Sequence, residues 1–175
     1  MRIIAGRLGG RQFAAPKGHR TRPMSDKMRG ALFNSLGDIT GLSVLDAFAG
    51  SGALSFEALS RGGRSVLAID SDPAAQRTIA DNVRELRLGQ QLKLIKASAN
   101  AWLSTTDQQF DVMLADPPYD DIQFGLLTKL ADRVKPGGIM VYSLPPNTRL
   151  NLSENYELLT EKTYGDSSLT FYRRN

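Results

Sequence analysis

The sequence predicts an α/β fold built on a mostly parallel, doubly wound sheet with helices on both faces. Short aliphatic strands alternate with helical segments between residues 43 and 144. Such alternation produces parallel strands joined by helical crossovers. Three acids, Asp46, Asp70 and Asp116, each lie at the end of a predicted strand. Because ligands bind at the carboxyl ends of strands in such sheets, these acids predict one shared site.

The elements before the alternating part are a small hairpin and a helix. Short apolar runs at residues 2–5 and 11–15 flank a glycine-rich stretch, which predicts a small N-terminal β-hairpin. Ser25 is a good N-cap for a helix that reaches Leu36, and Gly37 follows as its stop signal.

The alternating part and the tail follow in order. Strands are expected at 43–46, 65–70, 91–96, 110–116 and 139–144, and helices at 53–61, 73–88, 99–103 and 122–134. Asp72 caps the second of these helices and Pro73 opens it. Residues 135–138 read Lys-Pro-Gly-Gly and end the last helix. The tail, residues 156–173, is interrupted by a Gly-Asp pair, which predicts an antiparallel C-terminal hairpin strand.

Composition excludes several classes of protein. The chain has 175 residues, no Cys and one His, which excludes a disulfide scaffold, a cysteine nucleophile and a thiolate zinc site. We therefore expect no metal. No apolar run reaches transmembrane length, and the N-terminus lacks the apolar core of a signal peptide. These features predict a cytoplasmic protein without membrane association, which we expect to be a monomer.

Charge is distributed unevenly along the chain. Residues 1–29 hold eight basic residues and one acid, a net charge of +7, whereas the remainder has a net charge of −3. A basic segment on a mildly acidic body is typical of a nucleic-acid binder. We therefore expect an arm, residues 1–24, that contacts nucleic acid and precedes a single compact domain, residues 25–175. The candidate contacts are Arg2, Arg7, Arg11, Lys17, Arg20, Arg22, Lys27 and Arg29.

The tetrapeptide Asp116-Pro117-Pro118-Tyr119 follows a predicted strand directly. Prolines fix φ and remove N–H donors, so this loop is stiff and presents acceptors. The carboxylate of Asp116 and the carbonyl of Pro117 can accept hydrogen bonds from an exocyclic amino group, and Tyr119 can stack on the flat ring that carries it. All four residues, Pro118 included, are therefore candidate catalytic residues for alkylation of a ring amine. A plain strand-to-helix turn is the alternative interpretation.

A glycine-containing loop precedes the helix that starts at Ala53. Gly50 and Gly52 allow close approach of a ligand to a helix N-terminus, and Asp70 follows Gly52 by 18 residues, as the ribose-binding acid does in nucleotide sites. Ser55 occupies the third glycine position of a dinucleotide motif, which favours S-adenosylmethionine over NAD. The candidate cofactor residues are Asp46, Phe48, Ala49, Gly50, Ser51, Gly52, Asp70, Ser71, Ser98 and Ala99.

With these motifs in view, the chain resembles the bacterial 16S ribosomal RNA guanine-N2 methyltransferase family, the RsmD type, over nearly its full length. The resemblance rests on four stretches: residues 1–6, residues 21–23 with 25–26 and 28–36, residues 46–52 with 57–62, and residues 116–119. It implies a Rossmann-like class I methyltransferase fold that uses S-adenosylmethionine. It also implies methylation of the exocyclic N2 of one guanine in small-subunit RNA, in an assembled or assembling 30S subunit.

Two positions depart from the pattern of that family. Ser98 stands where an acid or amide usually follows the third strand, and Gly30 replaces a common Glu in the first helix. Two other functions remain open from the sequence. The acid-Pro-Pro-aromatic loop also suits a DNA adenine-N6 or cytosine-N4 methyltransferase, and a basic arm on a relic fold would suit a non-catalytic RNA-binding assembly factor.

Overall fold

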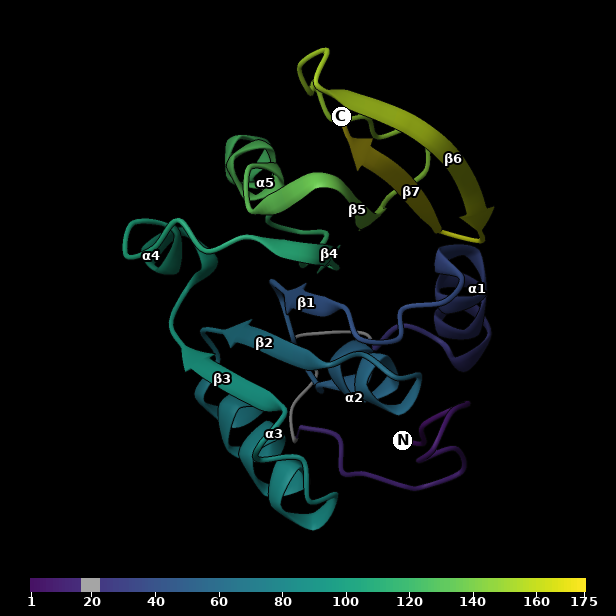
Figure 1. Ribbon diagram of the computed structural model, residues 1–175, viewed down its shortest axis with the longest axis vertical. Helices are drawn as coiled ribbons and strands as arrows, with labels where there is room; N and C mark the ends of the chain where they lie inside the picture. The colour runs from purple at the N-terminus through teal and green to yellow at the C-terminus, as the bar shows by residue number, and fades with distance from the viewer. Residues whose placement is uncertain (17–22) are drawn as a thin grey trace.

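The computed structural model describes residues 1–16 and 23–175, and these form a sheet with helices on both faces (Figure 1). The seven strands of this part of the chain lie in the order β3-β2-β1-β4-β5-β7-β6. Strands β1 to β5 are parallel, and β7 is antiparallel to both β5 and β6. The predicted fold class is confirmed. The strands are β1 (Ser43–Asp46), β2 (Ser65–Asp70), β3 (Leu92–Lys96), β4 (Phe110–Ala115), β5 (Val134–Leu144), β6 (Tyr156–Tyr164) and β7 (Ser167–Arg174).

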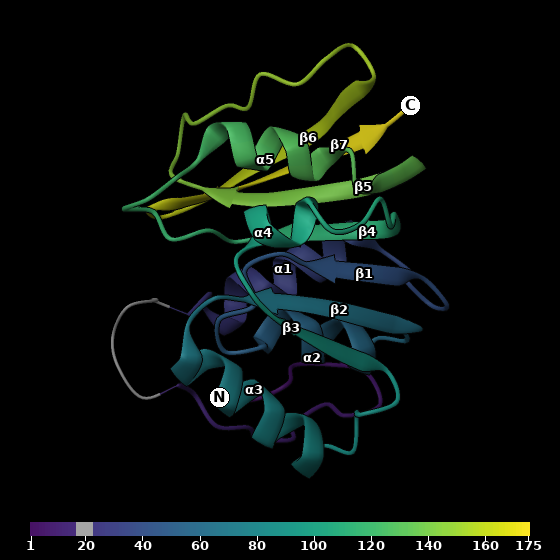
Figure 2. The same ribbon diagram turned by 90° about the vertical axis from the view of Figure 1, so that its left-hand side faces the viewer.

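The strand order reverses at β1, which pairs with β2 on one side and β4 on the other. Val44 of β1 is in register with Val66 of β2 and Val112 of β4. Figure 2 shows that β1, β2 and β5 end at the same edge of the sheet, on the left of that view. Chain segments that leave β1 and β4 diverge at this edge, which is where doubly wound sheets form their ligand clefts.

The helices occupy both faces of the sheet as the alternation requires. Ser25 caps α1 by accepting a hydrogen bond from the backbone N–H of Met28, and Asp72 caps α3, which Pro73 opens. Both caps were predicted from the sequence. The helices of the described part are α1 (Asp26–Leu36), α2 (Ala53–Ser60), α3 (Pro73–Glu85), α4 (Ala99–Leu103) and α5 (Phe124–Ala131).

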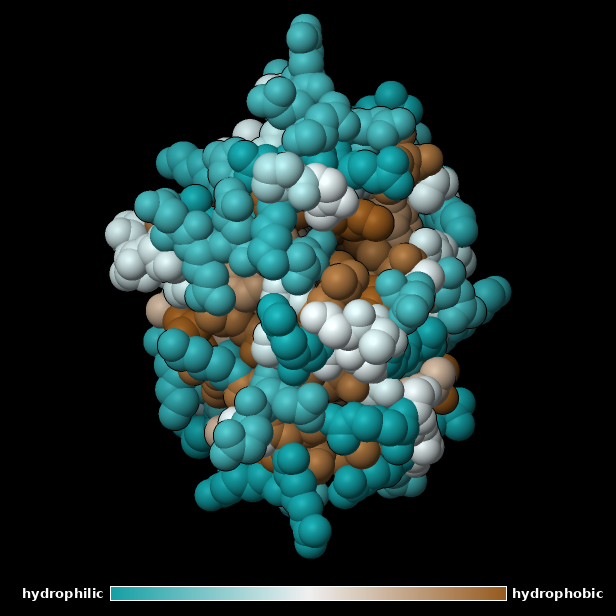
Figure 3. Space-filling view, viewed as in Figure 1, coloured by the Kyte–Doolittle hydropathy of each residue, from teal (hydrophilic) through white to brown (hydrophobic). Residues whose placement is uncertain are grey.

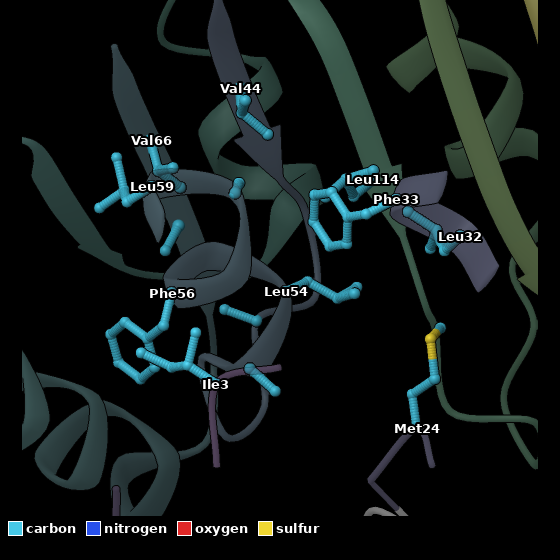
Figure 4. Close-up of a cluster of buried hydrophobic side chains, with 14 of the residues drawn as sticks. Ile3, Met24, Leu32, Phe33, Val44, Leu54, Phe56, Leu59, Val66 and Leu114 are labelled. Atoms are coloured by element: carbon cyan, nitrogen blue, oxygen red, sulfur yellow. The ribbon is translucent and has the colours of Figure 1, made fainter. Parts of the chain in front are cut away.

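Alternate residues of the buried strands pack into two separate apolar clusters. Val44 faces α1, α2 and α3, whereas Leu45 faces α4 and α5. Figure 4 shows the first cluster, in which Phe56 and Ile3 lie side by side beneath the sheet residues. The inward and outward positions of the central strands are both apolar because parallel strands are covered on both faces.

The N-terminal segment is part of this core. The predicted hairpin reduces to a single antiparallel bridge between Arg2 and Gln12, while Ile3 and Phe13 are buried against α2. The ring centroids of Phe13 and Phe56 are 5.1 Å apart in an edge-to-face arrangement. The described part of the arm is therefore packed against the domain.

Two predicted boundaries are wrong at the end of the alternating part. Helix α5 ends at Ala131 and not at Val134, and β5 begins at Val134 and not at Ile139. The β4–β5 register shifts there, since Phe110 pairs with Val134 but Val112 pairs with Ile139. The Lys-Pro-Gly-Gly turn thus interrupts a long strand and does not precede it.

Candidate active site

A cavity of about 1030 Å³ lies where the chain leaves the strands at the switch point. Phe48 to Ser51, after β1, line one side, and Asp116 to Asp120, after β4, line another. The start of α1 and the β6–β7 turn complete the wall. The cavity thus joins the two sequence motifs that were expected to form one site. Several lining residues carry no signal for the site in the sequence, among them Met24, Ser25, Met28, Leu54, Ser143 and Tyr164 to Ser167.

The two glycines of the loop after β1 serve different purposes. Gly50 has φ 55°, and a Cβ placed on it would meet no atom closer than the Phe48 carbonyl oxygen at 4.0 Å. Gly52 has φ 80°, and its Cβ would lie 2.7 Å from the ring of Phe56. Gly52 is therefore required for packing of α2, whereas Gly50 leaves open space beside the cavity that a ligand can approach.

Asp46, the last residue of β1, is fully buried. Its Oδ2 accepts a hydrogen bond from the Ser55 hydroxyl at 2.6 Å, while Oδ1 is buried without a hydrogen-bond partner among the described residues. Burial raises the pKa of Asp46 to about 7, with nearby Asp116 and Asp70 adding to the rise and Ser55 opposing it. This carboxylate is suited to receive a cationic or N–H donor group.

Asp70 closes the same loop from the end of β2. Its Oδ2 accepts the backbone N–H of Gly50 at 2.7 Å, and its Oδ1 accepts the N–H of Asp72 at 2.8 Å. Burial raises its pKa, and these backbone bonds oppose the rise. Each oxygen keeps a second lone pair, so Asp70 can still accept a hydrogen bond from a ligand hydroxyl.

Asp46, Gly52 and Asp70 do not line the cavity themselves, and three further cofactor candidates also lie beyond its wall. Ser71 is exposed after β2, and Ala99 is buried at the start of α4. Ser98 caps α4 by accepting the N–H of Ala101 at 3.2 Å. None of these three residues lines the cavity, although they follow the neighbouring strands β2 and β3.

The loop after β4 presents a partly buried acid and an exposed ring. Pro117 is buried, whereas Tyr119 is 37 % exposed. The Tyr119 hydroxyl lies 2.9 Å from the Ser143 hydroxyl, which also hydrogen-bonds the Asp116 carboxylate. Burial raises the pKa of Asp116 to about 6, and the bond to Ser143 opposes the rise. Ser143 therefore links the acid to the ring, and its place at the end of β5 was the signal that could have identified it.

The basic residues divide into three groups. Arg2, Arg7, Arg11 and Lys27 are exposed, whereas Lys17, Arg20 and Arg22 lie outside the described residues. The prediction that Arg29 contacts RNA is wrong, because its side chain is fully buried.

Hydrogen bonds inside the protein explain the burial of Arg29. Its Nη2 donates to the Arg2 carbonyl at 2.7 Å and to the Asp26 carboxylate at 2.9 Å. The buried carboxylate of Glu57 lies 3.9 Å from its Nε and accepts the backbone N–H groups of Ile4 and Ala5. Arg29 and Glu57 together hold the N-terminal segment against α1 and α2.

A smaller cavity of about 320 Å³ lies between β3 and α4. Figure 3 shows this side of the molecule, where hydrophobic residues (brown) reach the surface between the positions of α4 and β3 in Figure 1. The lining includes Leu67, Ile95 and Trp102 but none of the acids discussed above. Asp116 lines the larger cavity, and the loop that follows Asp46 also lines it, so we assign the chemistry to that cavity.

Comparisons with known proteins agree with this site. The family model described as conserved hypothetical protein 95 matches residues 1–173. The Escherichia coli (strain K12) protein named ribosomal RNA small subunit methyltransferase D is 31 % identical, over 99 % of this chain and 90 % of its own length. The chain belongs to this RsmD-type methyltransferase family. The protein of the same name from Haemophilus influenzae is 32 % identical, over 99 % of this chain and 93 % of its own length.

Solved structures extend the RsmD-type assignment to the whole fold. The structure of yhhF from Escherichia coli superposes with a TM-score of 0.90 at 29 % identity, and covers 100 % of this chain and 98 % of that one. Within the part of the chain that the structure describes, no helix is long and apolar enough to cross a membrane. The described residues also contain no group of three potential metal ligands.

The described site fits the cofactor of class I methyltransferases. The unpartnered Oδ1 of Asp46 matches an ammonium group, and the open space at Gly50 admits a ligand close to the backbone. A pyrophosphate would be repelled by three carboxylates in this arrangement, namely Asp46, Asp70 and Asp116. The donor set therefore favours a cationic ligand over a dinucleotide.

Proposed function

We propose that this RsmD-type chain methylates the exocyclic N2 of one guanine in 16S ribosomal RNA, with S-adenosylmethionine as the cofactor. The observation that carries the proposal is the single cavity shared by the loop after β1 and the Asp116 to Tyr119 loop. A cofactor site and an acceptor for a ring amine thus face one another. The printed names of the relatives supply the substrate class, small-subunit ribosomal RNA.

Three groups of the chain would hold the cofactor. Asp46 would accept the ammonium group of the amino-acid part, Gly50 would let the ligand approach the backbone, and Asp70 would accept a ribose hydroxyl. Ser71, Ser98 and Ala99 would border the adenine at the ends of β2 and β3. When bound, S-adenosylmethionine supplies an electrophilic methyl group.

The chain's own contribution to the reaction is the orientation of the amine. The lone pair of a guanine N2 is delocalised into the ring, so the nitrogen must pyramidalise before it attacks. Asp116 and the Pro117 carbonyl would accept its two N–H groups and favour that geometry. Acceptors fixed in advance lower the barrier because they need no reorganisation during the reaction. The buried Pro117 and the Ser143 contact keep these acceptors in place.

The target base would lie on the ring of Tyr119, whose exposed face lines the cavity. Stacking of one base on an aromatic side chain contributes about 1–3 kcal/mol. A base in an RNA loop costs less to unstack than a base in a duplex. The exposed cations Arg2, Arg7, Arg11 and Lys27 would contact the phosphate backbone, without base specificity.

Methyl transfer to ribosomal subunits tests this proposal. Purified protein and labelled S-adenosylmethionine are added to small subunits from a strain that lacks this gene, and the RNA is digested to nucleosides for mass spectrometry. We expect N2-methylguanosine at one site. Naked 16S RNA and fully assembled subunits, tested in parallel, separate the two possible forms of the substrate.

Three other outcomes would contradict the proposal in different ways. Label on adenine or cytosine of added DNA would keep the amine site but assign a DNA substrate. Binding of subunits without any methyl transfer would favour a non-catalytic assembly factor. No label on RNA, subunits or DNA, despite measurable cofactor binding, would favour a small-molecule substrate.

A further inference from the structure

Ser55 lies in the first turn of α2, at the position where a dinucleotide-binding loop has its third glycine. Its side chain is fully buried, and its hydroxyl donates to Asp46 Oδ2 at 2.6 Å. Hydrogen bonds of this length are typical of a hydroxyl that donates to an ionised carboxylate. Ser55 therefore fixes the carboxyl group at the end of β1 from the helix that follows the cofactor loop.

The other oxygen of the same carboxyl group, Asp46 Oδ1, has no partner among the described residues although it is buried. Leaving a buried acceptor unsatisfied costs free energy, and natural proteins contain few such atoms. The loop that lines the cavity begins two residues later, at Phe48. A donor group that enters beside this loop would satisfy Oδ1 while Ser55 keeps Oδ2.

We infer that Ser55 is a positioning residue of the cofactor site, which holds one oxygen of Asp46 so that the other accepts the ammonium group of S-adenosylmethionine, directly or through one water. This inference rests on the cofactor named in the proposed function. It gives a role to Ser55, which by the dinucleotide-binding motif alone is only a departure from the third glycine. Ser55 acts through Asp46, and neither residue lines the cavity itself.

The surrounding charges make this arrangement sensitive to pH. The groups that face Asp46 are Asp70 at the end of β2, Asp116 after β4 and the Ser55 hydroxyl from α2. Burial raises the pKa of Asp46 to about 7, the two acids raise it further, and Ser55 lowers it. Loss of the hydroxyl would therefore raise this pKa and leave Asp46 neutral over more of the range near pH 7.

Calorimetric titration with S-adenosylhomocysteine tests the inference without any turnover, because this ligand carries the same ammonium group. Wild type and Ser55→Ala are titrated between pH 6 and pH 8.5, in two buffers with different ionisation enthalpies. We expect Ser55→Ala to weaken binding at pH 7 by roughly tenfold, as for loss of a hydrogen bond to a charged group. We also expect a smaller deficit at pH 8.5 and a larger number of protons released on binding at pH 7.

Two further variants keep the result interpretable. Ser60→Ala removes another buried hydroxyl of α2, one that bonds the N-terminal segment at Leu8 and not Asp46, and should leave affinity unchanged. If Ser55→Ala does not fold, Ser55→Cys fills the position with a slightly larger side chain and a weaker donor. It should show the same change in pH dependence, but a smaller one.

Two results would overturn the inference while leaving the proposed cofactor intact. Equal affinity and equal proton release in wild type and a folded Ser55 variant would show that the hydroxyl has no role in binding. Equal losses in the Ser55 and Ser60 variants would assign the effect to α2 stability. Failure of folded wild type to bind S-adenosylhomocysteine at any pH would instead contradict the proposed cofactor, and with it the inference.

Discussion

The cofactor half and the amine half of the site differ in how far their side chains are exposed to solvent. On the cofactor side, Asp46 is fully buried and Asp70 has both oxygens bound to backbone N–H groups. On the amine side, Tyr119 is 37 % exposed and is held by its hydroxyl contact to Ser143. A small ligand of constant shape suits a preformed, enclosed subsite, whereas a base carried by a large RNA needs an open one.

We expect a substitution in the amine half of the site to leave cofactor binding intact. Asp116→Ala removes the acceptor of the amine side, and we expect methyl transfer to fall by at least about 10²–10³, as for the loss of one preorganised group. Affinity for S-adenosylhomocysteine should stay within about threefold of wild type, because the cofactor loop is untouched. The measurement is single-turnover methyl transfer beside calorimetry. The control is Asp121→Ala, because Asp121 is an exposed acid of the same segment that does not line the cavity. Full activity of Asp116→Ala would contradict the assignment of Asp116 as a catalytic residue.

The basic segment contains a second contrast, between a buried and an exposed cation. Arg29→Ala should destabilise the protein by about 3 kcal/mol, because it removes the buried donor to the Arg2 carbonyl and to Asp26. Arg61 would remain as the ion-pair partner of Glu57. Lys27 lies two positions earlier and is exposed, so Lys27→Ala should leave stability unchanged. It should lower the slope of the salt dependence of RNA binding by about one, as expected for one phosphate contact. Urea unfolding and filter binding at several salt concentrations measure the two effects. Equal stability of the two variants would contradict the structural role of Arg29.

On the cofactor side, the buried Asp46 should lower the free energy of unfolding by an amount that depends on pH. The pKa of Asp46 is raised from 3.8 to about 7, so the folded state binds a proton that the unfolded state releases between these values. Stability is therefore lost as pH rises through about 7. Asp46→Asn does not titrate, and it should be more stable than wild type by about 3 kcal/mol at pH 8 and by little at pH 4. Thermal unfolding at both pH values measures this, and a pH-independent difference would refute it.

The smallest expected effect lies on the open side. Tyr119→Ala should weaken the apparent affinity for RNA by about 1–3 kcal/mol through loss of stacking. Tyr119→Phe keeps the ring and loses only the Ser143 contact, so it should lose less than about 1 kcal/mol. Competition binding with wild-type and variant protein measures both values. If Tyr119→Phe weakens RNA binding as much as Tyr119→Ala, the affinity depends on the hydroxyl contact to Ser143 and not on stacking.

The order of the elements could be predicted from the sequence because its signals are local. Ser25 and Asp72 mark helix starts within three residues of themselves, and the apolar strands need no distant partner to be recognised. The acids Asp46, Asp70 and Asp116 could be placed in one site because strands in a parallel sheet end at a common edge.

What the sequence did not predict depends on contacts between distant segments. The link between Tyr119 and Ser143 joins residues 24 positions apart, and nothing in either segment alone indicates it. The β6–β7 turn also reaches the cavity only through the antiparallel pairing of β5 and β7. Arg29 was assigned to RNA because charge along a chain does not tell which side chains turn inward. Its helical neighbours Leu32 and Phe33 are themselves buried.

The most direct test of the contrast between the two halves is the affinity for S-adenosylhomocysteine of Asp46→Asn and Asp116→Asn proteins, measured side by side at pH 8. Each change removes one carboxylate charge from the same edge of the sheet, at the end of β1 or just after β4. We expect Asp46→Asn to weaken binding at least tenfold and Asp116→Asn to bind like wild type. Equal losses in the two proteins would show that the cofactor responds only to the summed charge of the acids, and would contradict a division into two separate halves.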